Sequence, residues 1–157
     1  MVLGTEPSDF RIESQVLFNE MYHFTANAPD GSGFSSLFEL LMPSLEGCRP
    51  WVKGHGTGTL EAGRLEAEAI QRYLPKSPLV SWKGSLGHTL GSCAVVELAI
   101  ALEAIRQGRI PGTVHSKPPY FADCVAGDTF SGDTFDSVVL TSNAFGGAHA
   151  AMLIRHG

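Results

Sequence analysis

The sequence is poor in cysteine, and the three cysteines that it has are far apart. Cys48, Cys93 and Cys124 are odd in number and share no short spacing. Disulfide frameworks and zinc cages need closely arranged thiols, so the sequence predicts neither. A reducing cytoplasm is the expected location.

The chain also lacks a basic stripe and a long apolar run. Its 11 basic residues are outnumbered by 16 acidic ones, which gives a net charge of −5. No cluster of Lys and Arg offers a counter-charge to phosphates, so we expect no nucleic-acid partner. No run of apolar residues approaches the length of a membrane span. Residues 1–10 have neither the basic start nor the apolar middle of a signal peptide.

What is present is an ordinary globular composition. The chain has 157 residues, the length of one domain, and is 43% hydrophobic and 17% charged. Short β-rich runs alternate with helical stretches, which predicts an α/β fold. We expect a single domain over residues 1–157, with no structure assigned to residues 1–20. The predicted helices are 33–42, 60–74 and 91–107, the predicted strands begin at 51, 79, 137 and 150, and residues 115–134 are predicted to form a surface loop.

The predicted strands have a consequence for assembly. They are short and apolar, as in sheets that are covered on both faces. A sheet of this small size would leave an edge or a layer exposed to water. We therefore expect a partner chain.

The first motif that points to chemistry is His55-Gly56-Thr57-Gly58-Thr59, directly after a predicted strand. Glycines on both sides of the histidine favour a tight turn and leave the imidazole open to a substrate. A turn histidine without a role is the simpler interpretation. The whole pentapeptide at a strand end favours the functional one.

A second motif runs from Lys83 to His88 and lies between a predicted strand and a long predicted helix. Near a helix N-terminus the macrodipole disfavours protonation, so a neutral His88 could donate an N–H to a carbonyl oxygen that gains charge. The alternative is that His88 only starts the helix and Lys83 is solvated. Because α/β sites gather outside the carboxyl ends of strands, His55 and His88 together favour a functional site.

A third motif, residues 142–147, connects the last two predicted strands and contains Gly146 and Gly147. A hairpin turn that needs positive φ explains such glycines. The functional alternative is a pocket-lining loop with Phe145 as a wall.

The order of these motifs resembles the C-terminal half of the β-ketoacyl synthases of the thiolase superfamily. His-Gly-Thr-Gly-Thr is followed by Lys-x-x-x-Gly-His and then by Asn-x-Phe-Gly-Gly. Residues 23–33 resemble the family's His-x-Thr-Ala…Pro-Asp-Gly stretch, and residues 107–113 resemble its Gly-x-Ile-Pro-x-Thr segment. The resemblance covers residues 22–154. It implies the C-terminal half of a thiolase-like fold, with helices packed on a mixed β-sheet.

The resemblance implies a decarboxylative Claisen condensation in fatty acid or polyketide synthesis. In that family a cysteine takes an acyl group from acyl carrier protein, and the carbanion of a malonyl thioester then attacks it. By position, His55 and His88 resemble the two histidines that stabilise charge on the malonyl carbonyl. Lys83 resembles the site lysine, and Glu66 resembles the carboxylate that pairs with it, although a solvated glutamate remains the alternative. The implied substrate pocket contains Thr57, Thr59, Asn143, Phe145, Gly146 and Gly147.

No cofactor is implied by the resemblance, because the substrates are carried on the phosphopantetheine of acyl carrier protein. A metal site is the remaining alternative for His55 and His88, but no spacing of Cys, His and carboxylate ligands supports it. The implied partners are that carrier protein and a second ketosynthase component. This component is either an N-terminal half or a full-length ketosynthase subunit.

The sequence departs from the family in three respects. The catalytic cysteine belongs to the N-terminal half, which this chain does not contain, and we assign its own three cysteines to structure or surface. Gly63 stands where the family usually has an aspartate. The final motif is shorter than Asn-Ser-Phe-Gly-Phe-Gly-Gly, so Asn143 falls near the gating phenylalanine, which implies an altered gate.

Three hypotheses remain open at this point. The chain is half of a split condensing enzyme, an acyltransferase only together with a cysteine-bearing half. Alternatively, it is a non-catalytic partner that resembles a chain-length factor and binds a complete ketosynthase. The third hypothesis is a fragment of a longer synthase.

Overall fold

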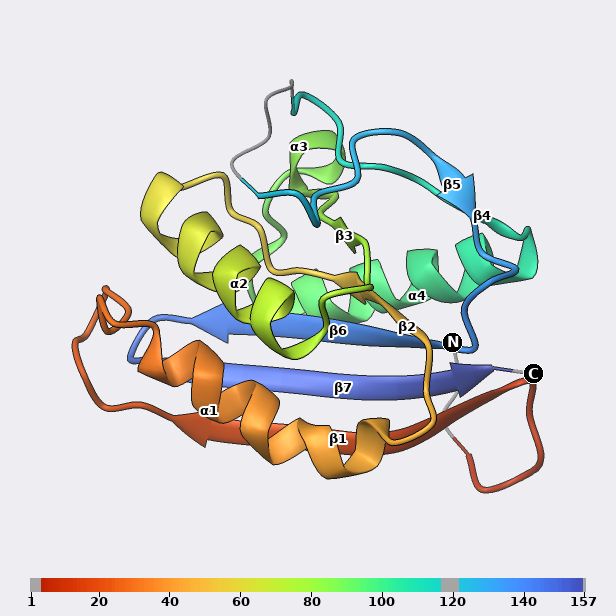
Figure 1. Cartoon of the computed structure of the whole chain (residues 1–157), viewed down its shortest axis with the longest axis horizontal. Helices are drawn as coiled ribbons and strands as arrows, with labels where there is room; N and C mark the ends of the chain where they lie inside the picture. The colour runs from red at the N-terminus through yellow and green to blue at the C-terminus, as the bar shows by residue number, and fades with distance from the viewer. Residues whose placement is uncertain (1–3, 117–121, 157) are drawn as a thin grey trace.

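A mixed five-stranded β-sheet forms the centre of the molecule (Figure 1). The computed structural model describes residues 4–116 and 122–156. In order across the sheet, the strands are β1 (Phe10–Asn19), β7 (Ala148–His156), β6 (Ser137–Ala144), β2 (Pro50–Lys53) and β3 (Leu79–Val80). Strand β2 runs parallel to β3 and β6, and β7 runs antiparallel to β1 and β6. The prediction of an α/β fold with a mixed sheet is confirmed.

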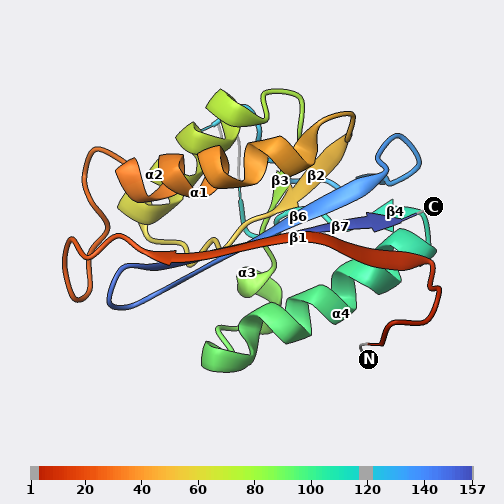
Figure 2. The same cartoon turned by 90° about the horizontal axis from the view of Figure 1, so that it is seen from below.

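Helices cover both faces of this sheet. They are α1 (Ser32–Leu41), α2 (Leu60–Tyr73), the short α3 (Lys83–Leu86) and α4 (Cys93–Arg106), with 3₁₀ turns η1 (Met42–Leu45) and η2 (Leu90–Ser92). Helices α1 and α2 lie on one face, and α4 lies on the other (Figure 2). A separate ribbon pairs β4 (Arg109–Ile110) with β5 (Phe130–Ser131). In the two described stretches, no helix is long and apolar enough to cross a membrane.

The apolar spacing of α1 explains its place on the sheet. Phe34, Leu37, Phe38 and Leu41 are buried and recur at intervals of three and four residues, which puts them on one helix face. They pack in one core with Ile70 of α2 and with the sheet. The three helices predicted from periodicity are therefore present, with ends that differ by one or two residues.

Strand β2 contributes side chains to two separate cores, because successive residues of a strand point to opposite faces. Val52 lies in the core beneath α1 and α2, whereas Trp51 lies in the core that α4 closes. By the same alternation Lys53 points to the α4 side, where Trp82 and Leu98 also pack. A lysine in this apolar layer needs an anionic partner.

Within the segment 1–20, to which the sequence assigns no structure, residues 10–19 form the edge strand β1. It pairs with β7 from Phe10 to Asn19, with an irregularity between Ile12 and Ser14. Most of its side chains are exposed; Val16 and Phe18 pack against one core and Phe10 packs against the other. The irregularity between Ile12 and Ser14 interrupts the alternation of apolar and polar residues, which is why the sequence did not predict this strand.

Two predicted connections also differ from the structure. Strand β6 extends to Ala144 and β7 begins at Ala148, so the first half of the predicted 142–147 loop is strand and residues 145–147 form the turn. The predicted 115–134 loop contains β5, which pairs with β4. Residues 117–121 of that loop lie outside the described residues.

Candidate active site

A cavity of about 460 Å³ lies beside the ends of β2 and β3. Among the residues predicted for the site, Thr57, Thr59, Glu66, Lys83 and His88 line it. The rest of its wall comes from the 56–63 segment, from Leu79, Ser81 and Gly84, from residues 113–116 and from Val125.

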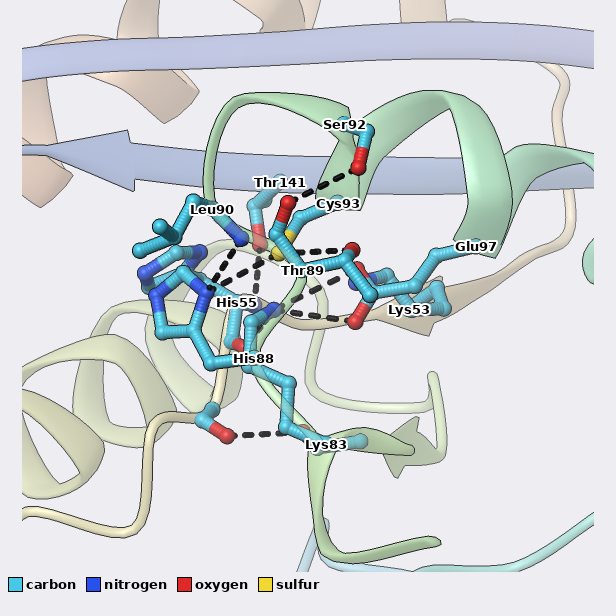
Figure 3. Close-up of polar contacts among 12 residues, drawn as sticks. Lys53, His55, Lys83, His88, Thr89, Leu90, Ser92, Cys93, Glu97 and Thr141 are labelled. Atoms are coloured by element: carbon cyan, nitrogen blue, oxygen red, sulfur yellow. Dashed lines mark hydrogen bonds and ion pairs between the residues drawn. The ribbon is translucent and has the colours of Figure 1, made fainter. Parts of the chain in front are cut away.

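His55 is not among the lining residues, but it contacts one of them. The ring centroids of His55 and His88 are 5.7 Å apart, and the rings meet edge to face at 79°. The imidazole of His55 is therefore reached from the cavity past that of His88. Both imidazoles lie in the polar cluster drawn in Figure 3.

Glu66 holds the backbone of the loop that carries His55. Its carboxylate accepts the backbone N–H of His55 at 2.8 Å and that of Gly56 at 3.1 Å. The hydroxyl of Thr141, on β6, donates to the same carboxylate at 2.5 Å and accepts the His55 N–H at 3.1 Å. Hydrogen bonds to an ionised acceptor are about twice as strong as neutral ones, so the loop is firmly oriented.

Close packing requires the glycines on either side of His55. A Cβ at Gly54 would lie 2.6 Å from a methyl carbon of Leu79. Gly56 has φ of +47°, and a Cβ there would lie 2.1 Å from the hydroxyl oxygen of Ser81. Neither position tolerates a side chain, which is the physical reason for the Gly-His-Gly sequence.

Lys83 pairs with a different glutamate from the one predicted. Its Nζ lies 2.9 Å from Oε1 of Glu97, on α4, and also donates to the backbone carbonyl of His55 at 2.6 Å. The prediction that Glu66 pairs with this lysine is wrong, because Glu66 is already engaged by backbone N–H groups. Lys83 and Glu66 therefore hold opposite sides of His55, the first at its C=O and the second at its N–H.

A second lysine shares the same carboxylate. Lys53 Nζ contacts the other oxygen of Glu97, and all three side chains are buried (Figure 3). Burial lowers the pKa of Lys53, although the negative charge of Glu97 opposes this effect. Two lysines therefore share one buried carboxylate.

His55 is neutral over the physiological range. Burial, together with the positive charges of Lys83 and Lys53, lowers the pKa of His55 from 6.5 to about 4, against the opposing charge of Glu66. A neutral imidazole carries one N–H and has one acceptor nitrogen. It can therefore donate that one N–H to an oxygen that gains charge.

Backbone contacts define the tautomer of His88. Its Nδ1 accepts the backbone N–H of Leu90 at 3.1 Å and lies 3.0 Å from Sγ of Cys93 (Figure 3). Since Nδ1 accepts, the proton of a neutral His88 sits on Nε2. This N–H is a hydrogen-bond donor on a residue that lines the cavity.

The last predicted motif lies elsewhere. Asn143 belongs to β6, and Phe145, Gly146 and Gly147 form the turn before β7; none of the four is among the residues that line the cavity. Phe145 is 79% exposed. The backbone N–H of Gly146 donates to the carbonyl of Phe24 at 2.6 Å, so the turn packs against the 20–25 segment instead.

The cysteines differ in their surroundings. Cys93 lies against His88, which the sequence did not predict. Burial raises the pKa of Cys124 to about 11, so this residue is a protonated thiol at neutral pH. Among the described residues, no group of three or more His, Cys, Asp or Glu side chains could hold a metal ion.

Three residues of the site were not predicted from the sequence, although the sequence pattern around two of them indicates a buried role. Glu97 interrupts an apolar helix and Lys53 ends an apolar strand. Because such residues are rarely buried unless they are paired, a lysine and a glutamate inside apolar patterns indicate a buried ion pair. Thr141 gave no signal, since threonine is common in strands.

Comparison with known proteins gives a family match and a fold match. The family described as "Beta-ketoacyl synthase, C-terminal domain" matches residues 12–117. The chain is 28% identical to 3-oxoacyl-[acyl-carrier-protein] synthase 2 of Coxiella burnetii over 86% of this chain and 35% of that protein. It is 29% identical to the actinorhodin polyketide putative beta-ketoacyl synthase 1 of Streptomyces coelicolor over 85% of this chain and 31% of that protein.

Among solved structures, the ishigamide ketosynthase/chain length factor matches with a TM-score of 0.81 at 24% identity, covering 95% of this chain and 38% of that one. This likeness shows that the fold is that of the ketosynthases, as the sequence predicted. The chain spans about a third of the length of the curated relatives named here.

Proposed function

Because the chain belongs to the β-ketoacyl synthase family through its C-terminal domain, we propose that it supplies the histidine half of a condensing site. The reaction is the decarboxylative condensation of acyl and malonyl thioesters carried on acyl carrier protein. The observation that carries the proposal is the edge-to-face pair of His55 and His88, 5.7 Å apart at the cavity.

The proposed chemistry uses the two imidazoles as hydrogen-bond donors. When the malonyl group loses CO₂, the electron pair of the broken C–C bond moves toward the thioester carbonyl, whose oxygen gains negative charge. The Nε2–H of His88 donates to this oxygen, and the neutral His55 supports it from the same side. The carbanion then attacks an acyl thioester, forms the new C–C bond and displaces a thiolate. Loss of one such donor typically costs about 100- to 1,000-fold in rate.

The nucleophilic cysteine is proposed to come from another polypeptide segment. Helix α4 supports this part of the proposal, because its outer face is apolar but exposed. Val95 and Val96 are 58% and 37% exposed, and Leu90 before the helix is 76% exposed. A helix that is hydrophobic on all sides is normally buried. A ketosynthase half that covers α4 would bury this face and bring its cysteine toward His88.

The substrates arrive on the phosphopantetheine of acyl carrier protein, and the proposed reaction needs no cofactor held by this chain. The cysteines among the described residues are all unpaired. That state fits a reducing compartment, and we propose the cytoplasm.

The test is to purify the chain together with its natural partner and to measure condensation. We expect the partner to contribute a cysteine half, and His55→Ala or His88→Ala in this chain to abolish product formation. Lys76→Met, at an exposed position on the connection after α2, is the control that should keep full activity. Unchanged turnover in both histidine variants would overturn the proposal.

A second candidate is a chain-length-factor-like partner of a complete ketosynthase. It is favoured by the exposed Phe145, which projects from the turn between β6 and β7 without lining the cavity. Under this alternative the histidine variants leave the rate nearly intact, whereas Phe145→Ala changes the length of the product. Product analysis by mass spectrometry separates the two functions.

A further inference from the structure

Lys53 is a buried charge to which neither the family resemblance nor the proposed chemistry gives a role. It ends β2, which lies between β3 and β6 in the sheet, and it is 1% exposed. Its side chain lies on the α4 side of the sheet, in a layer otherwise occupied by Trp51, Trp82 and Leu98.

Stability of the fold does not explain a lysine at this position. Removing a lysine from water costs several kcal/mol, which the attraction of one carboxylate repays only in part. Glu97 is already paired with Lys83 at 2.9 Å, so it does not need Lys53 to neutralise it. An apolar side chain of similar length, such as methionine, would fill the same space at a lower desolvation cost.

The contacts of Lys53 lead to the backbone of His55 in three steps. Lys53 Nζ contacts Oε2 of Glu97, Oε1 of Glu97 contacts Lys83 Nζ, and Lys83 Nζ donates to the carbonyl of His55. Because Lys53 contacts Oε2 of Glu97, Lys83 bonds mainly to Oε1. Lys83 Nζ lies 2.9 Å from Oε1 and 3.3 Å from Oε2, and it keeps one N–H for the carbonyl of His55. Without Lys53, both oxygens of Glu97 are free to draw Lys83 away from that carbonyl.

The charges around His55 give Lys53 a second effect. Lys83 and Lys53 make protonation of His55 less favourable, Glu66 makes it more favourable, and His88 acts in the same direction as the lysines. One lysine would be balanced by Glu97 alone. Lys53 therefore adds to the effect of burial and of Lys83 on His55, against the opposing charge of Glu66.

We propose that Lys53 is a positioning residue of the histidine site: through Glu97 it holds Lys83 against the carbonyl of His55. The substrate chemistry of this role rests on the proposed function. The positioning of His55 by Lys53 does not depend on the proposed function, and it can be tested without measuring turnover.

The test compares the full chain with the variants Lys53→Met, Lys53→Arg and the exposed control Lys76→Met. Histidine side chains labelled with ¹⁵N are titrated by NMR, and His55→Gln assigns the His55 signal. We expect the pKa of His55 to rise above about 4 in Lys53→Met, because a positive charge has been removed. Lys53→Arg keeps the charge and should bring the pKa back toward the wild-type value, and Lys76→Met should leave it there. An unchanged His55 titration in Lys53→Met would overturn the proposal.

Unfolding by urea separates positioning from a structural role. We expect Lys53→Met to be as stable as the wild type or more stable, since methionine removes a buried charge. Failure of this variant to fold would show that Lys53 serves the fold, and would also overturn the proposal.

A last experiment distinguishes failure of this inference from failure of the proposed function. In the assembled protein, Lys53→Met should lower kcat for CO₂ release from a malonyl thioester by up to about 100-fold, with KM nearly unchanged. If no variant, including the wild type, releases CO₂ while the His55 titration responds as described, the proposed function fails and the positioning role stands. If CO₂ is released at the same rate with and without Lys53, the positioning role fails alone.

Discussion

Glu66 and Glu97 are both buried carboxylates, and they act on opposite sides of His55. Glu66 accepts the N–H of His55 directly, whereas Glu97 fixes the lysine that donates to its C=O. The resemblance pointed to the histidines and to Lys83, but it assigned the lysine to the wrong glutamate. Spacing along the chain does not reveal which helix faces a side chain across a sheet, and α2 and α4 lie on opposite faces (Figure 2).

Replacing Glu66 by glutamine should loosen the His55 loop. The amide offers one neutral acceptor oxygen where the carboxylate serves the N–H groups of His55 and Gly56 and the hydroxyl of Thr141. We expect Glu66→Gln to lower the free energy of unfolding by about 1–3 kcal/mol in urea denaturation. Glu68→Gln, on the exposed side of the same helix, is the control. Equal stability of the two variants would contradict the role assigned to Glu66.

The lowered pKa of His55 makes stability depend on pH in a defined direction. The folded protein protonates this imidazole at about 4, whereas the unfolded chain does so near 6.5. The unfolded state therefore binds more protons between these values, and stability falls as pH drops from 6.5 to 4. His149 and His156 also have lowered pKa values because of burial, and contribute in the same direction.

A single variant isolates the contribution of His55. Urea unfolding at pH 7, 5.5 and 4.5 should give a shallower loss of stability for His55→Gln than for the wild type. The exposed His23→Gln should follow the wild-type curve. If the His55→Gln curve has the same slope as the wild type, then His55 is not held neutral by the fold.

At the scale of elements, the three long helices and the edge strand β3 are predictable from the sequence, and the edge strand β1 is not. A regular apolar stripe predicts a helix over 60–74, and α2 runs from Leu60 to Tyr73. In β1 the irregularity between Ile12 and Ser14 breaks the alternation that would predict a strand. The turn around Phe145 is predicted to line the pocket because its glycines resemble a family motif. Phe145 is not among the residues that line the cavity, since only the tertiary structure determines which loops share one.

Helix α4 should be part of an interface through its outer face. Val95→Asp places a charge on the exposed apolar surface, where it costs little in the isolated chain but is desolvated when a partner covers the helix. We expect Val95→Asp to leave the urea unfolding midpoint nearly unchanged and to weaken partner binding by about tenfold or more in calorimetry. Val95→Ala, which adds no charge, should bind almost normally. Full binding by Val95→Asp would place the partner on another surface.

At the scale of the whole molecule, the structure is a sheet covered by helices on both faces, with a candidate site beside the ends of β2 and β3. Helices α1 and α2 cover one face and close a core, whereas α4 has no further layer over it among the described residues (Figure 2). The chain spans about a third of the length of its curated relatives. The apolar strands predict a partner chain, and the exposed apolar residues of α4 agree with that prediction.

The most direct test of the account is the release of CO₂ from a malonyl thioester by the assembled protein. Under the proposed function, decarboxylation uses the histidine donors and not the cysteine, so replacing the proposed partner's nucleophilic cysteine by alanine should stop condensation and leave CO₂ release intact. In that background, His88→Ala in this chain should slow CO₂ release by about 100- to 1,000-fold. An unchanged rate of CO₂ release in His88→Ala would contradict the claim that this chain carries the histidine half of the site.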